Sequence, residues 1–214
     1  MKYKAVIFDL DGTLRDTKDL ILAAYEHAIE VHNGRKPSWE ELEPHIHHHS
    51  VVHRELSGHI DYDAWLTTYR GKLGDRWMDA PFFPGTEKVL EQLKAAGLRL
   101  AVVTAAEHDR TLEYLRYRSI DQYFDVVVGM NKKMRPKPAP DMIHEALRQL
   151  GTEPQQTTMV GDMTTDVEAA HSAHITCVGI THGFASREQH ETARADYIVD
   201  SLSELLGIVL EAAK

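Results

Sequence analysis

The spacing of apolar residues changes early in the chain, from a continuous run to a helical repeat. Residues 4–8 form a mostly apolar run rich in β-formers, which predicts a strand covered on both faces of a parallel sheet. Beyond Leu14 the apolar positions recur at helical spacing, namely at Leu20, Ile21, Ala24, Ala28 and Val31. We therefore expect a long helix over residues 16–32 directly after the strand.

The stretch that follows this helix shows helical fragments and no strand pattern as far as residue 78. Ser38 precedes one fragment, and Glu41 stands three residues later, which predicts a capping box. Residues 81–85, Pro-Phe-Phe-Pro-Gly, are typical of a hinge-like connection because two prolines and a glycine surround two aromatic residues. These patterns predict an all-helical insertion over residues 15–82.

Strand and helix patterns alternate over the rest of the chain. Strands are expected at 98–104, 125–129, 157–160, 176–180 and 197–199, and helices at 86–96, 107–117, 141–150, 164–173 and 202–213. Such alternation is typical of βαβ units and a parallel sheet. The predicted fold class is α/β, with a Rossmann-like three-layer core over residues 1–14 and 83–214 and a helical domain inserted into it.

Composition narrows the possible partners. The 214 residues carry a formal net charge of -9, which argues against nucleic-acid and anionic-membrane partners, since these need a basic surface. Cys177 is the one cysteine, so no internal disulfide can form. No apolar run approaches the ~18 residues of a membrane helix, and the N-terminus lacks the pattern of a signal peptide. We expect a cytoplasmic protein, and the sequence does not distinguish a monomer from a dimer.

Two carboxylates follow the first strand. Asp9 and Asp11 are two residues apart, so on a strand their side chains point the same way, although the turn at Gly12 can redirect the second. An ordinary strand followed by an Asp-Gly turn would show the same residues. In parallel sheets, however, ligands bind beyond the carboxyl ends of the strands, where both carboxylates would lie.

Other predicted strand ends supply complementary groups. Thr104 ends one strand, Lys137 stands between two prolines after another, and Asp162 and Asp166 follow a third. Several carboxylates at one edge repel one another unless a hard cation lies among them, and oxygen ligands suit Mg²⁺. A hydroxyl and an ammonium beside that ion could bind the oxygens of a phosphoryl group.

Taken together, four short motifs resemble the signature of the haloacid dehalogenase superfamily of phosphohydrolases. Residues 9–13 match its Asp-x-Asp-Gly-Thr motif, Thr104 its hydroxyl residue, and Lys137 its lysine. Residues 161–166 match its Gly-Asp-x-x-x-Asp motif. The motifs occur in the family's order and extend over nearly the whole chain.

The resemblance implies a role for each matched residue. Asp9 would attack phosphorus and form an aspartyl-phosphate, and Asp11 would protonate the leaving oxygen and later deprotonate water. Mg²⁺ would be held by Asp9, the backbone carbonyl of Asp11 and Asp162. Asp166 would bind the ion less directly or orient Lys137.

The loops around these residues are expected to contact the substrate. The expected contacts are Gly12, Thr13, Arg15, Ala105, His48 and His49. Ala105 departs from the family pattern, which often has asparagine after the threonine, and its amide can still reach a phosphate oxygen. Arg15 has two interpretations, a contact with a substrate anion or a solvated or ion-paired arginine.

The helical insertion occupies the position of the family's cap, which closes over the site and selects the leaving group. Part of it is rich in histidine: His45, His47, His48 and His49, with His53 and His59 beyond. Three interpretations stay open, namely a solvated edge, a loop that contacts an anionic leaving group, and a transition-metal site built on i, i+4 pairs.

The function implied by the resemblance is Mg²⁺-dependent hydrolysis of a small phosphate monoester, similar to phosphoglycolate phosphatases. The expected partner is a small phosphorylated metabolite. An inorganic pyrophosphatase with the same machinery is the alternative, since some relatives with this kind of cap use pyrophosphate. A phosphosugar mutase and a catalytically silent binding protein are the other hypotheses.

Overall fold

The computed structural model describes residues 3–46, 49–58, 60–74, 76–131 and 134–210. The chain divides into two compact units, Met1–Asp16 with Pro81–Lys214, and Thr17–Ala80. The first unit thus ends at Asp16, where the sequence suggested residue 14, and resumes at Pro81, where it suggested residue 83.

The first unit is built on a six-stranded parallel sheet. Its strands are β1 Ala5–Phe8, β2 Arg99–Glu107, β3 Val126–Met130, β4 Thr157–Gly161, β5 Thr176–Ile180 and β6 Tyr197–Val199. They lie in the order β3-β2-β1-β4-β5-β6, and all neighbouring pairs are parallel. The chain moves outward from β1 on one side and from β4 on the other, and ligands of such sheets bind at this switch point.

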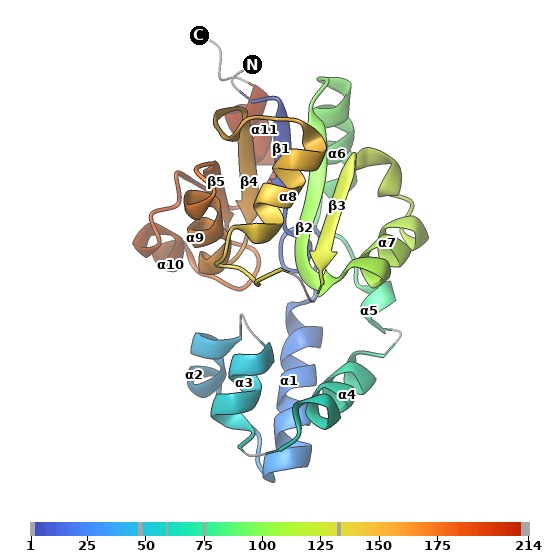
Figure 1. Ribbon diagram of the computed structural model, residues 1–214, viewed down its shortest axis with the longest axis vertical. Helices are drawn as coiled ribbons and strands as arrows, with labels where there is room; N and C mark the ends of the chain where they lie inside the picture. Colours follow the sequence, from blue (N-terminus) through green and yellow to red (C-terminus); the bar gives the residue numbers. More distant parts are fainter. Residues whose placement is uncertain (1–2, 47–48, 59, 75, 132–133, 211–214) are drawn as a thin grey trace. The chain divides into compact units, whose positions relative to one another are not determined.

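Helices cover both faces of the sheet. They are α6 Thr86–Ala95, α7 His108–Tyr117, α8 Asp141–Leu150, α9 Thr164–Ser172, α10 Arg187–Thr192 and α11 Leu202–Leu210, with 3₁₀ turns at Asp121–Tyr123 and Pro154–Gln156. In Figure 1, α8 and α9 lie in front of the sheet, and α6 and α11 lie behind it. Apolar residues of α8 and α9 share one buried core with Ala5 and Ile7 of β1. The predicted α/β class with a central parallel sheet is confirmed.

Some elements differ from the sequence-based expectation. The strand expected to end at Thr104 continues to Glu107, but its register with β3 shifts between these two residues. The apolar pattern does not predict α10, because its six residues are too few to show helical periodicity. Its capping box, formed by Ser186 and Gln189, was the available signal. The helix expected over 202–213 is described as far as Leu210, and the remainder lies outside the described residues.

The second unit is helical throughout its described residues. It contains α1 Lys18–Asn33, α2 Trp39–Leu42, a 3₁₀ turn Glu43–His45, α3 His49–Leu56, α4 Tyr62–Leu73 and α5 Arg76–Asp79. Gly34, with a φ of 77°, ends α1 in the left-handed conformation that favours glycine. The predicted capping box is confirmed, because the Glu41 amide donates to Ser38 Oγ and the Ser38 amide donates to the Glu41 carboxylate.

An aromatic cluster forms the centre of the second unit. Trp65 and Tyr69 of α4 stack on each other, and Tyr69 lies 4.8 Å from Tyr25 of α1 between ring centroids. The Tyr25 hydroxyl donates to the carbonyl of Ile46. Buried aromatic rings with a satisfied hydroxyl stabilise a small helical unit by apolar burial. Within the described part of the whole chain, no helix is both long and apolar enough to span a membrane.

Candidate active site

Asp9 lies at the carboxyl end of β1, beside β4 at the switch point of the sheet. Its amide donates to the carbonyl of Val160 at 2.9 Å, so its backbone extends the pairing of the two strands by one position. Its side chain is buried, with 8 % exposed. The central strand therefore fixes this carboxylate on a rigid element.

Lys137 joins the Asp9 carboxylate to that of Asp166. Its Nζ donates to Asp9 Oδ1 at 2.6 Å and also contacts Asp166 Oδ1. Asp166 lies in the first turn of α9, where its Oδ2 accepts from the Met163 amide. The fixed φ of Pro136 and Pro138 restricts the backbone around this lysine. The structure thus brings together three residues from separate segments that the sequence assigned to one site.

Asp162, directly after β4, completes the cluster. Its Oδ1 accepts from Thr13 Oγ1 at 2.9 Å, and its Oδ2 accepts from the Phe184 amide at 2.9 Å. A Cβ at Gly12 or Gly183 would collide with this carboxylate, and Gly12 also has a φ of 85°. Glycine at position 12 therefore allows the loop after β1 to lie against Asp162.

The cluster contains more carboxylates than positively charged groups. Burial raises the pKa of the Asp9 carboxyl well above its ordinary value, although the Lys137 ammonium opposes this. Burial, with the Asp166 carboxylate as the next cause, raises the pKa of Asp162 to about 7. Burial would lower the pKa of Lys137, but the carboxylates of Asp166 and Asp9 together raise it. Three buried carboxylates around one ammonium would bind a further cation favourably.

The geometry of the carboxylates fits a metal ion. One ligand oxygen from each of Asp9, Asp162 and Asp166 lies within 4.8 Å of the others, and all three residues are buried. A set made only of oxygen donors suits a hard divalent cation. These three residues could hold such an ion.

The carboxylate of Asp11 is bound by Arg15. Arg15 Nε donates to Asp11 Oδ1 at 2.7 Å, and Nη2 donates to Oδ2 at 3.0 Å. The Arg15 side chain is fully buried, whereas that of Asp11 is 18 % exposed. Of the two interpretations of Arg15, the structure shows the ion-paired arginine.

Thr104 is the last residue of the regular pairing of β2 with β3, and Ala105 follows it. Thr104 is buried, and its Oγ1 accepts from the Ala106 amide at 3.1 Å. Ala105 is exposed. Gly129, on the neighbouring strand β3, packs so closely against this turn that a Cβ would collide with the backbone of Ala106 and His108.

Two of the predicted substrate contacts, His48 and His49, belong to the histidine-rich segment. His48 lies outside the described residues, and the side chain of His49 in α3 lies outside them too. His53 is described: its Nε2 lies 2.7 Å from the Ile60 carbonyl, and its ring packs edge-on against Tyr62 and Trp65. This histidine therefore belongs to the aromatic cluster of the second unit.

Sequence reasoning missed the loop after β5. His182 Nε2 lies 2.9 Å from the Thr13 carbonyl, and its ring stacks on Phe83 with centroids 3.7 Å apart. Burial lowers the pKa of this imidazole, which favours the neutral form that donates to the carbonyl. The available signal was position, since Thr181 to Phe184 follow a parallel strand at the same edge as Asp9 and Asp162.

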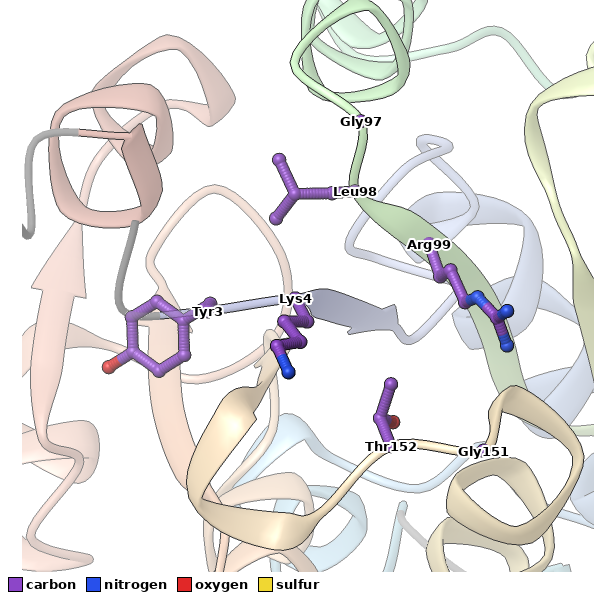
Figure 2. A pocket seen from close by; sticks show the side chains of 7 residues that line it. All are labelled: Tyr3, Lys4, Gly97, Leu98, Arg99, Gly151 and Thr152. Atoms are coloured by element: carbon purple, nitrogen blue, oxygen red, sulfur yellow. The ribbon is translucent and has the colours of Figure 1, made fainter.

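A cavity of about 440 Å³ lies at the opposite edge of the sheet. Figure 2 shows its lining: Tyr3, Lys4, Gly97, Leu98, Arg99, Gly151 and Thr152. These residues precede or begin β1, β2 and β4, so they lie at the amino ends of the strands. The cavity contains none of the residues predicted to act in catalysis.

Comparison with known proteins identifies the family. The model of the haloacid dehalogenase-like hydrolases matches residues 6–180. A protein of Caldanaerobacter subterraneus subsp. tengcongensis, provisionally named pyrophosphatase PpaX, is 32% identical over 98% of this chain and 96% of its own length. The similarity therefore includes both units.

Solved structures share the whole architecture. A crystal structure described as a predicted phosphatase from Clostridium acetobutylicum has a TM-score of 0.85 and 26% identity, covering 99% of this chain and 100% of that one. Another, described as a predicted phosphoglycolate phosphatase from Haemophilus somnus 129pt, has a TM-score of 0.81 and 25% identity, covering 97% and 98%. The resemblance inferred from the four motifs is confirmed: the chain belongs to the family of haloacid dehalogenase-like hydrolases.

Proposed function

We propose that this hydrolase cleaves a P–O bond in a small phosphorylated substrate through an aspartyl-phosphate on Asp9. The observation that carries the proposal is the cluster at the switch point, where Lys137 donates to Asp9 Oδ1 at 2.6 Å and also contacts Asp166. With Oδ1 held by the lysine, Oδ2 of Asp9 is the oxygen that attacks phosphorus.

In the first step, Asp9 Oδ2 forms a bond to phosphorus while the bond to the leaving oxygen breaks. Asp11 begins this step protonated: the electron pair of the broken bond goes to the leaving oxygen, which takes the proton of the Asp11 carboxyl and leaves a carboxylate. In the second step, water attacks phosphorus and gives its proton to Asp11. The bond from phosphorus to Asp9 breaks, its electron pair returns to the carboxylate, and inorganic phosphate leaves.

Other residues of the first unit bind the phosphoryl group and support its ligands. Thr104 donates its hydroxyl, and the amide of Ala105 donates as well, to the oxygens that are not transferred. Lys137 neutralises part of their charge. The Thr13 hydroxyl donates to Asp162 Oδ1 and so orients that carboxylate.

Asp9, Asp162 and the backbone carbonyl of Asp11 would hold Mg²⁺, with Asp166 orienting Lys137. When bound, the ion supplies positive charge that offsets the repulsion between the carboxylates and the phosphoryl group. The charge deficit of the cluster and its oxygen-only donors support this choice of cation.

Inorganic pyrophosphate is the favoured substrate within this proposal. The support is the name of the relative that is 32% identical over nearly its whole length. A phosphoglycolate-like monoester is the second candidate, supported by the description of the Haemophilus somnus structure. The helical unit, Thr17–Ala80, acts as the cap that selects between such leaving groups, since it is inserted directly after the loop that carries Asp11.

Phosphate release by the purified full chain tests the proposal. Pyrophosphate, phosphoglycolate and a hexose phosphate are supplied separately with Mg²⁺, and kcat/KM is compared. The highest value is expected for pyrophosphate, and a higher value for phosphoglycolate would replace it as the substrate. Isomerised hexose phosphate without free phosphate would indicate a mutase. No phosphate from any of them, or from a reactive aryl phosphate, would contradict hydrolysis.

A further inference from the structure

Arg15 is among the largest fully buried side chains of the protein. A guanidinium removed from water is costly unless hydrogen bonds and an opposite charge compensate it. Arg15 makes a two-pronged contact, in which Nε and Nη2 each donate to a different oxygen of Asp11. This fork fixes the plane of the carboxylate as well as its position.

An aromatic ring holds the other side of this arginine. The ζ carbon of Arg15 lies 4.1 Å from the centroid of the Tyr114 ring, and Tyr114 of α7 is itself buried. The Phe82 ring packs edge-on against Tyr114 with centroids 6.2 Å apart. The guanidinium is therefore confined between a rigid ring and a carboxylate, which leaves it little rotamer freedom.

Main-chain hydrogen bonds hold the loop between Asp11 and Arg15. The Gly12 amide donates to the Arg15 carbonyl at 2.9 Å, and the Arg15 amide donates to the Leu10 carbonyl at 3.1 Å. The backbones of Arg15 and Phe82 also form an isolated antiparallel β-bridge. Both ends of the ion pair are thus fixed by main-chain contacts as well as by side chains.

The exposed part of this arrangement is the carboxylate. The Asp11 side chain is 18 % exposed and that of Arg15 is 0 % exposed, so the arginine binds Asp11 from behind. A carboxylate offers about four lone-pair sites, and the fork occupies two of them. The other two can carry the proton that Asp11 gives to the leaving oxygen and later takes from water.

From this geometry we infer that Arg15, seated on Tyr114, is the positioning residue that aims Asp11 at the leaving oxygen. The inference rests on the proposed function, in which Asp11 transfers the proton. Arg15 touches neither the substrate nor the phosphorus and acts through Asp11. Its effect on the rate therefore depends on how much the leaving oxygen needs a proton.

Aryl phosphates whose phenols differ in acidity test the inference. Phenyl phosphate has a basic leaving oxygen that needs the proton, whereas 2,4-dinitrophenyl phosphate does not. The value of kcat/KM reports the steps up to release of the phenol, so it isolates the first proton transfer. Arg15→Gln is expected to lower it about 10- to 100-fold for phenyl phosphate and less than about threefold for the dinitrophenyl ester. Arg15→Lys keeps the charge without the fork and should lie between.

The matched control is Arg148→Gln. Arg148 makes the same kind of fork with Glu145, but on the exposed surface of α8. Its loss should change neither ester's kcat/KM. In the background of Asp11→Asn, adding Arg15→Gln should cost nothing more, because the residue that it positions is already disabled.

The outcomes separate this inference from the function on which it rests. An equal loss on both esters, with Arg15→Lys and Arg15→Gln both folded, would mean a structural role and overturn the inference. An increase in kcat/KM would show that Arg15 restrains Asp11 unproductively and would overturn it too. Wild-type protein without activity on either ester would instead remove the proposed function.

Discussion

Asp9 and Asp11 lie two residues apart after the same strand, but the fold surrounds their carboxylates with different numbers of charged groups. Asp9 shares Lys137 with Asp166 and lies within reach of Asp162, so three carboxylates surround one ammonium. Asp11 has its own guanidinium, that of Arg15, in a pair whose charges balance. The surroundings of Asp9 therefore carry more negative than positive charge, whereas the charge of Asp11 is balanced by that of Arg15.

This difference matches the two tasks that we propose. A nucleophile that receives an anionic phosphoryl group needs extra positive charge, and an incomplete cluster leaves room for a cation to supply it. A group that transfers protons needs a fixed direction, which the fork and the ring provide. The same residue type can therefore serve two roles because its neighbours differ.

Removal of the Asp9 nucleophile should have the largest effect. Asp9→Asn keeps the size of the side chain but cannot form an aspartyl-phosphate, so kcat should fall at least about 1,000-fold. Steady-state phosphate release measures the loss, and circular dichroism checks that the fold is kept. An activity near that of the wild type would rule out Asp9 as the nucleophile.

Removal of the Lys137 ammonium should be the next largest change. Lys137→Met leaves buried carboxylates without their cation, so the free energy of unfolding should fall by about 3–5 kcal/mol and kcat by about 100-fold or more. Urea denaturation without Mg²⁺ measures the first quantity. Lys94→Met is the matched control, because Lys94 pairs with Asp125 on the surface and should contribute less than about 1 kcal/mol. Equal losses for the two variants would contradict the contrast between buried and exposed pairs.

Mg²⁺ binding should stabilise the protein through the incomplete cluster. At a concentration 100 times its Kd the ion adds about 2.7 kcal/mol, which raises Tm by about 5–10 °C for a chain of this size. Differential scanning fluorimetry measures the shift without any turnover. Asp162→Asn should abolish it, whereas Asp200→Asn, at an exposed pair with Arg187, should keep it. A shift that survives Asp162→Asn would place the ion elsewhere.

The His182 imidazole should make a smaller, pH-dependent contribution. Burial lowers its pKa in the folded protein, so below about pH 6.5 the unfolded chain takes up the proton first. Its neutral form therefore favours folding above that pH, and the benefit is lost as pH falls toward the lower folded value. His182→Gln should reduce the fall in Tm between about pH 7.5 and about pH 5.5. The exposed His144→Gln is the control, and an unchanged fall for His182→Gln would contradict the assignment.

The sequence predicts the core of this protein well because its signals are local. A continuous apolar run identifies β1, and strand ends identify Asp9 and Asp162, which the structure then places together. Lys137 could be assigned to the same edge because the prolines on either side exclude a helix there.

What the sequence could not predict depends on contacts between distant segments. The pairing of Arg15 with Asp11 follows from burial by Tyr114, which lies about 100 residues further along the chain. The contact of His182 with the Thr13 carbonyl depends on how the loop after β5 folds back over the loop after β1. Neither contact leaves a periodic pattern in the sequence.

Mass spectrometry of the quenched reaction tests the role of Asp9 most directly. The Asp11→Asn variant should still accept the phosphoryl group from 2,4-dinitrophenyl phosphate, because that leaving group needs no proton. It should hydrolyse the resulting aspartyl-phosphate slowly, because it lacks the base that deprotonates water. Peptide mapping is expected to locate one phosphoryl group on Asp9, and none when Asp9→Asn is added. A phosphoryl group on another residue, or on none while phenol is released in a burst, would contradict covalent catalysis by Asp9.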